Sequence, residues 1–141
     1  MGRPTLVGSI TVKRSEEFCS KLDKLGIVYN TLDAKTLKDE AITISKAGLG
    51  KTITISTSVA GRGTDIKPSD DAINAGGLMV IGTALFGSIR IDSQLKGRSG
   101  MQGNPGSSEV YVSWEDQILR HLTKNELQRL RKAAILLPGE E

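Results

Sequence analysis

Residues 52–66, TITISTSVAGRGTDI, decide the fold of this chain. They begin with a run of β-branched residues, which favours a buried strand. Gly61 and Gly63 follow, and glycine allows backbone conformations and close approaches that other residues resist. Arg62 and Asp65 are therefore expected to project from a turn directly after a central strand. From shape alone, a plain turn with a solvated arginine and a capping aspartate is the simpler interpretation.

Strand and helix patterns alternate on both sides of this stretch. The alternation predicts a parallel sheet with helices on both faces, in which ligand-binding loops follow the carboxyl ends of the strands. We expect strands at Thr5–Val12, Ile27–Leu32, Thr52–Thr57, Leu78–Ile81 and Glu109–Ser113, and helices from Ser15 to about Leu25, at Lys35–Lys46 and at Ser88–Arg98. The first helix should turn Phe18, Leu22 and Leu25 inward, and the third Ile89, Ile91 and Leu95. Residues 67–77 should be a polar loop, and a long helical stretch, Trp114–Leu137, should break near Thr123.

A second glycine-rich segment, QLKGRSGMQGNPG at residues 94–106, lies where a helix gives way to a turn. It gathers Gln94, Arg98 and Gln102 around that transition. Arg98 could offer its planar donor fork to a phosphate, although an ordinary surface ion pair is the plainer alternative. The two segments together, in this order, predict half of a nucleotide site. That half presents an arginine to a phosphate but does not cradle the phosphates.

Residues 48–52, GLGKT, resemble the end of a phosphate-binding Walker A loop. Ser45 stands where the first glycine of that loop is required. A helix is also expected before the segment and a strand after it, which reverses the order that places a helix N-terminus at a phosphate. We therefore expect no phosphate-cradling loop in this chain.

The composition excludes several functional classes. The 141 residues carry a net charge of +3 and 4% aromatic residues, which indicates neither a base-stacking platform nor a nucleic-acid partner. No apolar run approaches the roughly 20 residues that span a bilayer. Cys19, the only cysteine, is expected to pack into the core in a reducing compartment, and with the single His121 it gives no metal-site pattern. We expect both ends of the sequence to be cuts in a longer protein.

The order and wording of the two glycine-rich segments resemble motifs V and VI in the second RecA-like lobe of SecA, the bacterial preprotein translocase ATPase. The resemblance covers about residues 2–120 and includes GRPTLVGSITVKRSE, AGGLMVIGT and NPGSSEVYVSWED. It implies an α/β, RecA-like fold of the P-loop NTPase superfamily, of the type found in helicase C-terminal lobes. That lobe would occupy residues 1–120, and residues 121–141 would be a helical extension leading to a scaffold.

The same resemblance implies that ATP binds between this lobe and a preceding lobe, which carries the Walker A and B motifs and holds Mg²⁺. Arg98 matches a catalytic arginine that contacts the γ-phosphate, and Asp65 matches a residue near the ribose. The turn Gly61–Gly63 matches the element that couples nucleotide state to lobe closure. Gln94 matches the residue that opens motif VI. The isolated chain lacks Walker A and B and is not expected to hydrolyse ATP, and no metal ligand is implied in it.

The parent implied by the resemblance couples ATP hydrolysis to movement of preproteins through the membrane translocon, from a cytoplasmic position peripheral to the membrane. Its partners would be the first lobe, the translocon and the preprotein. The usual motif reads QLRGR[SA]GRQGDPG, from which the chain departs at Lys96, Met101 and Asn104. Met101 replaces an arginine and cannot donate to a phosphate oxygen. These departures indicate a divergent, accessory-type SecA. A superfamily 2 nucleic-acid helicase lobe and a purely regulatory lobe with a degenerate ATP site remain as alternatives.

Overall fold

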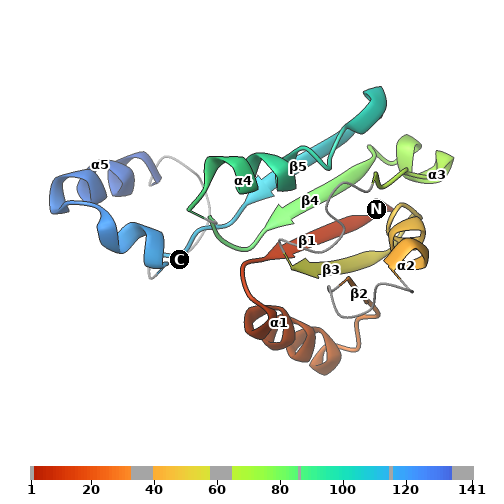
Figure 1. Ribbon diagram of the computed structural model, residues 1–141, viewed down its shortest axis with the longest axis horizontal. Coiled ribbons are helices and arrows are strands. Elements are labelled where there is room, and N and C mark those ends of the chain that lie inside the picture. Colours follow the sequence, from red (N-terminus) through yellow and green to blue (C-terminus); the bar gives the residue numbers. More distant parts are fainter. Residues whose placement is uncertain (1, 33–39, 58–64, 86, 115, 135–141) are drawn as a thin grey trace. The chain divides into compact units, whose positions relative to one another are not determined.

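The computed structural model describes residues 2–32, 40–57, 65–85, 87–114 and 116–134 (Figure 1). Their strands form one sheet in the spatial order β2-β3-β1-β4-β5, and every neighbouring pair runs parallel. The strands are β1 (Thr5–Ser9), β2 (Asn30–Leu32), β3 (Ile53–Thr57), β4 (Leu78–Gly82) and β5 (Gly106–Val110). The predicted parallel α/β sheet is therefore confirmed.

The helices alternate with the strands. They are α1 (Val12–Lys24), α2 (Glu40–Ala47), α3 (Asp70–Asn74), α4 (Ile89–Lys96) and α5 (Lys124–Ala134), with two 3₁₀ turns at Met101–Gly103 and Gln117–His121. The Thr11 hydroxyl accepts a hydrogen bond from the Arg14 N–H at 3.2 Å and starts α1. Gly26, at φ 66°, follows the end of α1 and reverses the chain.

Several predicted boundaries and orientations were wrong. The first strand ends at Ser9 because Thr11 already caps α1, and the last strand is Gly106–Val110 instead of Glu109–Ser113. Leu25 is 71% exposed because it lies beyond the last turn of α1, and Ile89 is 86% exposed at the first position of α4.

The predicted polar loop at 67–77 contains the short helix α3. Its start is capped by Ser69, whose hydroxyl accepts from the Ala72 N–H at 3.4 Å, and acidic residues occupy its first turn. The predicted break near Thr123 is confirmed. There the Thr123 N–H donates to Glu126 Oε2 at 2.8 Å, and the Glu126 N–H donates to Thr123 Oγ1 at 3.4 Å, a reciprocal cap that starts α5.

The main core lies on the face of the sheet that α2 and α4 cover. It is one cluster of buried side chains from three strands, two helices and the segment before α3: Leu6, Leu32, Ile44, Ala47, Ile66, Leu78, Val80 and Leu95. Val7 and its register partner Ile55 point to the opposite face because side chains alternate along a strand. Helix α1 packs there, against β1 and β3.

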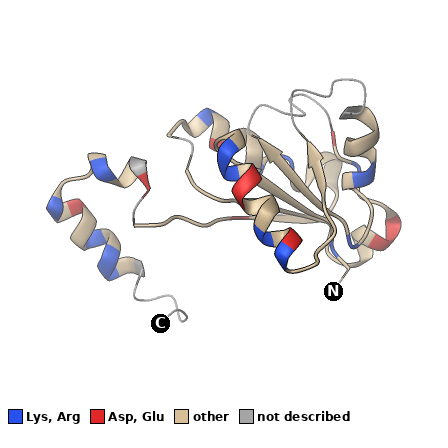
Figure 2. Cartoon of the chain, turned by 90° about the horizontal axis from the view of Figure 1, so that it is seen from below, with Lys and Arg blue, Asp and Glu red and all other residues tan. Residues whose placement is uncertain are grey.

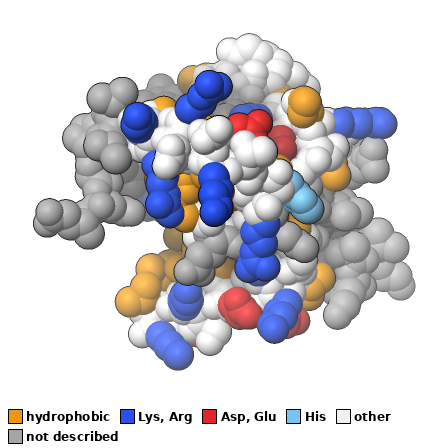
Figure 3. Space-filling model, turned by 90° about the vertical axis from the view of Figure 1, so that its left-hand side faces the viewer, with side chains coloured by type: hydrophobic (Ala, Val, Ile, Leu, Met, Phe, Trp, Pro, Cys, Tyr) orange, Lys and Arg blue, Asp and Glu red, His pale blue; other side chains and the backbone are white. Residues whose placement is uncertain are grey.

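The chain divides into two compact units, Met1–Tyr111 and Val112–Glu141. The first contains the sheet and α1–α4. Within the second, the Arg131 guanidinium lies 5.5 Å from the centre of the Trp114 ring, and the Ser113 N–H donates to Asp116 Oδ2 at 2.9 Å. Lys and Arg residues are frequent along α5 (Figure 2), and Lys and Arg side chains are frequent on the face of the molecule in Figure 3. None of the helices in the described residues is long and apolar enough to cross a membrane.

Candidate functional site

The carboxyl ends of β1, β3 and β4 form a polar edge of the sheet. Ser9 and Thr57 are buried register partners at the ends of β1 and β3. Thr83, directly after β4, donates from Oγ1 to the Gly8 carbonyl oxygen at 3.1 Å. Parallel α/β sheets bind their ligands outside this edge. The segment that leads to α4 leaves β4 here. The turn that holds Gln102 lies toward the opposite edge, because it leads into Gly106, which pairs with Leu78 at the start of β4.

Helix α4 is positioned by a close approach to two glycines. Leu95 is 8% exposed, and its two methyl carbons lie 2.6 and 2.7 Å from where a Cβ on Gly8 would be. A Cβ on Gly82 would lie 3.5 Å from the same side chain. The missing side chains therefore let α4 lie close against β1 and β4, which fixes the end of the helix that precedes Arg98.

The turn after α4 holds Arg98. The Gly97 N–H donates to the Ser93 carbonyl oxygen at 2.8 Å, and the Arg98 N–H donates to the Leu95 carbonyl oxygen at 3.2 Å. The Arg98 side chain is half-buried and its Nη1 is shielded from solvent. Gln94 is exposed on α4, one turn earlier. The turn thus presents a partly desolvated guanidinium, in which charge-assisted hydrogen bonds to an anion are strong.

The backbone after Arg98 runs through left-handed conformations. Gly100, Gln102 and Gly103 have φ angles of 71°, 55° and 80°. Glycine adopts this conformation freely, whereas a residue with a side chain loses roughly 1 kcal/mol or more. Among the described residues, Lys51 is the other non-glycine residue with a positive φ. Such local strain is a feature of functional turns.

Gln102 joins the two glycine-rich segments. Its Nε2 donates to Asp65 Oδ2 at 2.5 Å, across 37 positions of sequence. The other carboxylate oxygen, Oδ1, is buried and has no hydrogen-bond partner within the part of the chain that the structure describes. Buried polar atoms are nearly always hydrogen-bonded. Oδ1 is therefore an unsatisfied acceptor that the described residues do not explain.

The predicted site residues divide into two groups. Asp65, Gln94 and Arg98 lie within the described residues, and the structure ties the Asp65 segment to the Arg98 segment. The turn Gly61–Gly63, with Arg62, lies outside the described residues. The sequence prediction gathered Gln102 into the turn but gave it no role. The available signal was its place between Gly100 and Gly103, which predicts an unusual backbone at that position.

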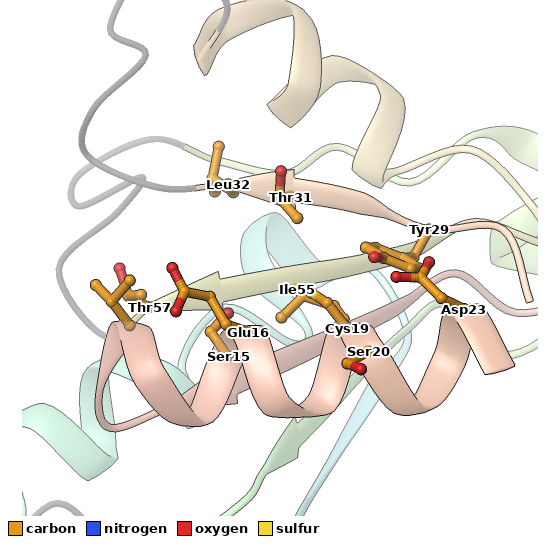
Figure 4. A pocket seen from close by; sticks show the side chains of 11 residues that line it. Ser15, Glu16, Cys19, Ser20, Asp23, Tyr29, Thr31, Leu32, Ile55 and Thr57 are labelled. Atoms are coloured by element: carbon orange, nitrogen blue, oxygen red, sulfur yellow. The ribbon is translucent and has the colours of Figure 1, made fainter.

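A separate pocket of about 270 Å³ lies between α1 and strands β2 and β3 (Figure 4). Cys19, Asp23 and Tyr29 contribute to its lining. Burial raises the pKa of the Cys19 thiol, although a hydrogen bond from Tyr29 opposes this. Desolvation, followed by hydrogen bonds to Asp23 and Cys19, raises the pKa of Tyr29 to about 12. Both groups are therefore protonated at neutral pH, and the thiol is a poor nucleophile. Cys19 is half-buried at this pocket, not fully buried in the core as predicted.

The segment GLGKT connects a helix to a strand, as the sequence predicted. Helix α2 ends at Ala47 and β3 begins at Ile53. The Lys51 N–H donates to the Gly2 carbonyl oxygen at 2.9 Å. This segment therefore precedes a strand, and its backbone arrangement is not that of a phosphate-binding loop, which opens a helix. No group of three or more His, Cys, Asp or Glu residues that could hold a metal ion is present in the described ranges.

Comparison with known proteins identifies the family. A family model described as the SecA P-loop domain matches residues 1–72 and 67–136. The chain belongs to the SecA family. It is 45% identical over 132 residues to the protein translocase subunit SecA 2 of a Bacillus cereus strain, covering 94% of this chain and 17% of that protein. It is 48% identical over 127 residues to the protein translocase subunit SecA of Clostridium botulinum (strain Hall), covering 90% of this chain and 15% of that protein.

A solved structure with low sequence identity has the same fold. The crystal structure of the C-terminal part of the Fun30 ATPase domain matches with a TM-score of 0.60 at 18% identity. The match covers 89% of this chain and 42% of that chain. At this identity the likeness concerns the fold alone. It supports the RecA-like α/β class expected from the sequence. The chain spans only a small share of the length of the SecA relatives that it matches.

Proposed function

We propose that this SecA family chain is the second RecA-like nucleotide-binding lobe of a translocase motor, and that it supplies one wall of an ATP site between two lobes. The observation that carries the proposal is the hydrogen bond from Gln102 to Asp65, because it draws two motif-bearing segments together beside the half-buried Arg98.

The described side chains fit two parts of ATP. Arg98 is a cation with a planar donor fork, which suits the oxygens of the terminal phosphate. Asp65 accepts hydrogen bonds but cannot donate them when ionised, which suits a ribose hydroxyl and not an anionic phosphate. Among the described residues, no loop is arranged to cradle the remaining phosphates. We therefore assign Walker A, Walker B and Mg²⁺ binding to the first lobe, and expect the isolated chain not to hydrolyse ATP.

Within the parent, the lobe would close on ATP and bring Arg98 to the transferred phosphoryl group. Arginines in that role stabilise transition-state charge and raise turnover by roughly 10³-fold or more. Opening and closing of the two lobes would couple turnover to movement of preprotein through the membrane translocon. The parent would work at the cytoplasmic face, peripheral to the membrane. The relatives are named as protein translocase subunits, which supports this role and favours it over a nucleic-acid helicase.

We further propose that the parent is a divergent, accessory-type SecA. Met101 stands where the usual motif has a second arginine, and its side chain is 37% exposed beside Gln102. Its thioether brings no charge and no strong donor to a phosphate. The site then has one arginine from this motif instead of two. This observation also supports the alternative of a regulatory lobe that binds nucleotide without promoting its hydrolysis.

The proposal is tested by ATP turnover when the 141-residue chain is mixed with the first nucleotide-binding lobe of its parent. Wild type is compared with Arg98→Ala, and with Arg90→Ala as a matched control, because Arg90 is an exposed arginine on the same helix. We expect wild type and Arg90→Ala to raise the turnover rate above that of the first lobe alone. With Arg98→Ala, this increase should be at least about tenfold smaller. If the lobes bind each other but no variant raises turnover, the regulatory alternative replaces this function.

A further inference from the structure

Gln102 combines two features that need a common explanation. Its backbone is left-handed, which is unfavourable for a residue with a side chain, and its exposed amide reaches an aspartate 37 positions away. An exposed hydrogen bond adds little to stability because water competes for both partners. The backbone cost is of the same order as that gain. Stability alone therefore does not account for a glutamine at this position.

The geometry at Asp65 supplies the explanation. The Gln102 amide occupies Oδ2, so the carboxylate can no longer rotate freely. Oδ1 is left buried and, within the described residues, without a hydrogen-bond partner. An ionised carboxylate accepts hydrogen bonds and repels phosphate oxygens. The group that Oδ1 suits is a neutral donor such as a sugar hydroxyl, while the nearby turn offers Arg98 to the charged end of the ligand.

We propose that Gln102 is a positioning residue for the nucleotide sugar: its amide orients the Asp65 carboxylate so that Oδ1 accepts a hydrogen bond from a ribose hydroxyl. The inference rests on the proposed ATP site and adds a specific consequence. The lobe recognises the ribose through Asp65, and this recognition depends on Gln102, which does not itself contact the ligand. Loss of Gln102 then affects sugar selectivity more than phosphate chemistry.

The test measures kcat/KM for ATP, 2′-deoxy-ATP and 3′-deoxy-ATP in the two-lobe mixture. Wild type should prefer ATP over at least one deoxy analogue by about tenfold or more, because a hydrogen bond to a charged acceptor is lost with the hydroxyl. Gln102→Glu keeps the size of the side chain but places a carboxylate against Asp65. This variant should bring the ATP preference close to one, with a smaller effect on kcat at saturating ATP. Gln128→Glu, the same change at a position on α5, outside the proposed site, should leave the preference unaltered.

Exchanging the donor and the acceptor between positions 102 and 65 distinguishes loss of the positioning hydrogen bond from a nonspecific loss of structure. In the double variant Gln102→Glu with Asp65→Asn, the new asparagine amide can donate to the new glutamate, so the bond is restored with its direction reversed. The asparagine oxygen still faces the sugar. We expect the double variant to regain most of the ATP preference that Gln102→Glu alone loses. Thermal unfolding of each 141-residue variant checks that all of them are folded.

The outcomes are distinguishable. Turnover with an ATP preference that is equal in wild type and a folded Gln102→Glu variant overturns the positioning role and leaves the proposed function intact. Turnover with no preference among the three nucleotides in wild type overturns the ribose contact. No turnover with wild type, although the lobes bind each other, overturns the proposed function, and this inference with it.

Discussion

Replacing Gly8 with alanine should force α4 away from the sheet. The added Cβ would lie 2.6 Å from Leu95 Cδ2 and 2.7 Å from Cδ1, well inside contact distance. Leu95 is only 8% exposed, so its methyl groups have little free space into which to turn. Overpacking of this kind costs about 1–3 kcal/mol of unfolding free energy. At about 4 °C per kcal/mol for a domain of this size, Tm should fall by about 4–12 °C.

A double-mutant cycle isolates this contact. Leu95→Ala alone should cost about 2–5 kcal/mol, because it removes buried methyl groups and leaves a cavity. With Gly8→Ala also present, the new methyl group lies in that cavity and the clash is gone. The double variant should therefore be more stable than the sum of the single effects predicts, by about 1–2 kcal/mol. Urea unfolding of the four proteins, followed by circular dichroism, measures the difference.

Two results would refute this reasoning. Gly8→Ala with unchanged stability would mean that α4 does not approach β1 as closely as the structure places it. Additivity within about 0.5 kcal/mol would mean that Gly8 and Leu95 do not share a contact. If the contact is real, Gly8→Ala should also lower ATP turnover in the two-lobe mixture, because the displaced helix leads directly into the turn that holds Arg98.

Three further predictions concern other parts of the chain. Helix α5 should lose helicity on Thr123→Ala and also on acidification, as measured by circular dichroism of residues 112–141. Hydrogen bonds from Thr123 lower the pKa of Glu126. The stabilisation of the helix by these bonds is therefore complete above the ordinary glutamate pKa and is lost as pH falls through the lowered pKa. Tyr29→Phe should slow the reaction of Cys19 with a thiol reagent at about pH 8, because it removes the hydrogen bond that opposes the raised thiol pKa; faster reaction would contradict this. Met101→Arg should raise ATP turnover in the two-lobe mixture severalfold by adding a cation to the phosphate end of the site, and no increase would favour the regulatory alternative.

The sequence predicted those elements whose pattern is local and strong. Strands β3 and β4 are compact apolar and β-branched runs, so their positions were predicted to within one residue. Strand β1 was predicted too long because apolar residues continue past Ser9 into α1, and only the Thr11 cap marks the boundary. Helix α3 was missed because it has only five residues, which are too few to show helical periodicity, and because Pro68, Ser69 and Gly76 around it indicate a loop.

The candidate site was predicted in part, for a physical reason. The glycine spacing indicated the turn after Arg98, whereas the predicted turn at Gly61–Gly63 lies outside the described residues. The roles that the resemblance to SecA implies for Asp65 and Arg98 stay predictions. The bond between Gln102 and Asp65 could not be predicted, because it joins two residues that are 37 positions apart and depends on tertiary packing. The close approach of Leu95 to Gly8 likewise follows from tertiary packing, although a glycine inside a strand is the pattern that such an approach leaves in a sequence.

We infer that this lobe completes an ATP site with Arg98. The most direct measurement titrates wild type and Arg98→Ala into a fixed amount of the first lobe and follows ATP hydrolysis. We expect turnover to rise to a plateau with wild type and to stay near the first lobe's own rate with Arg98→Ala. Equal turnover with both proteins, at concentrations where both bind the first lobe, would contradict it.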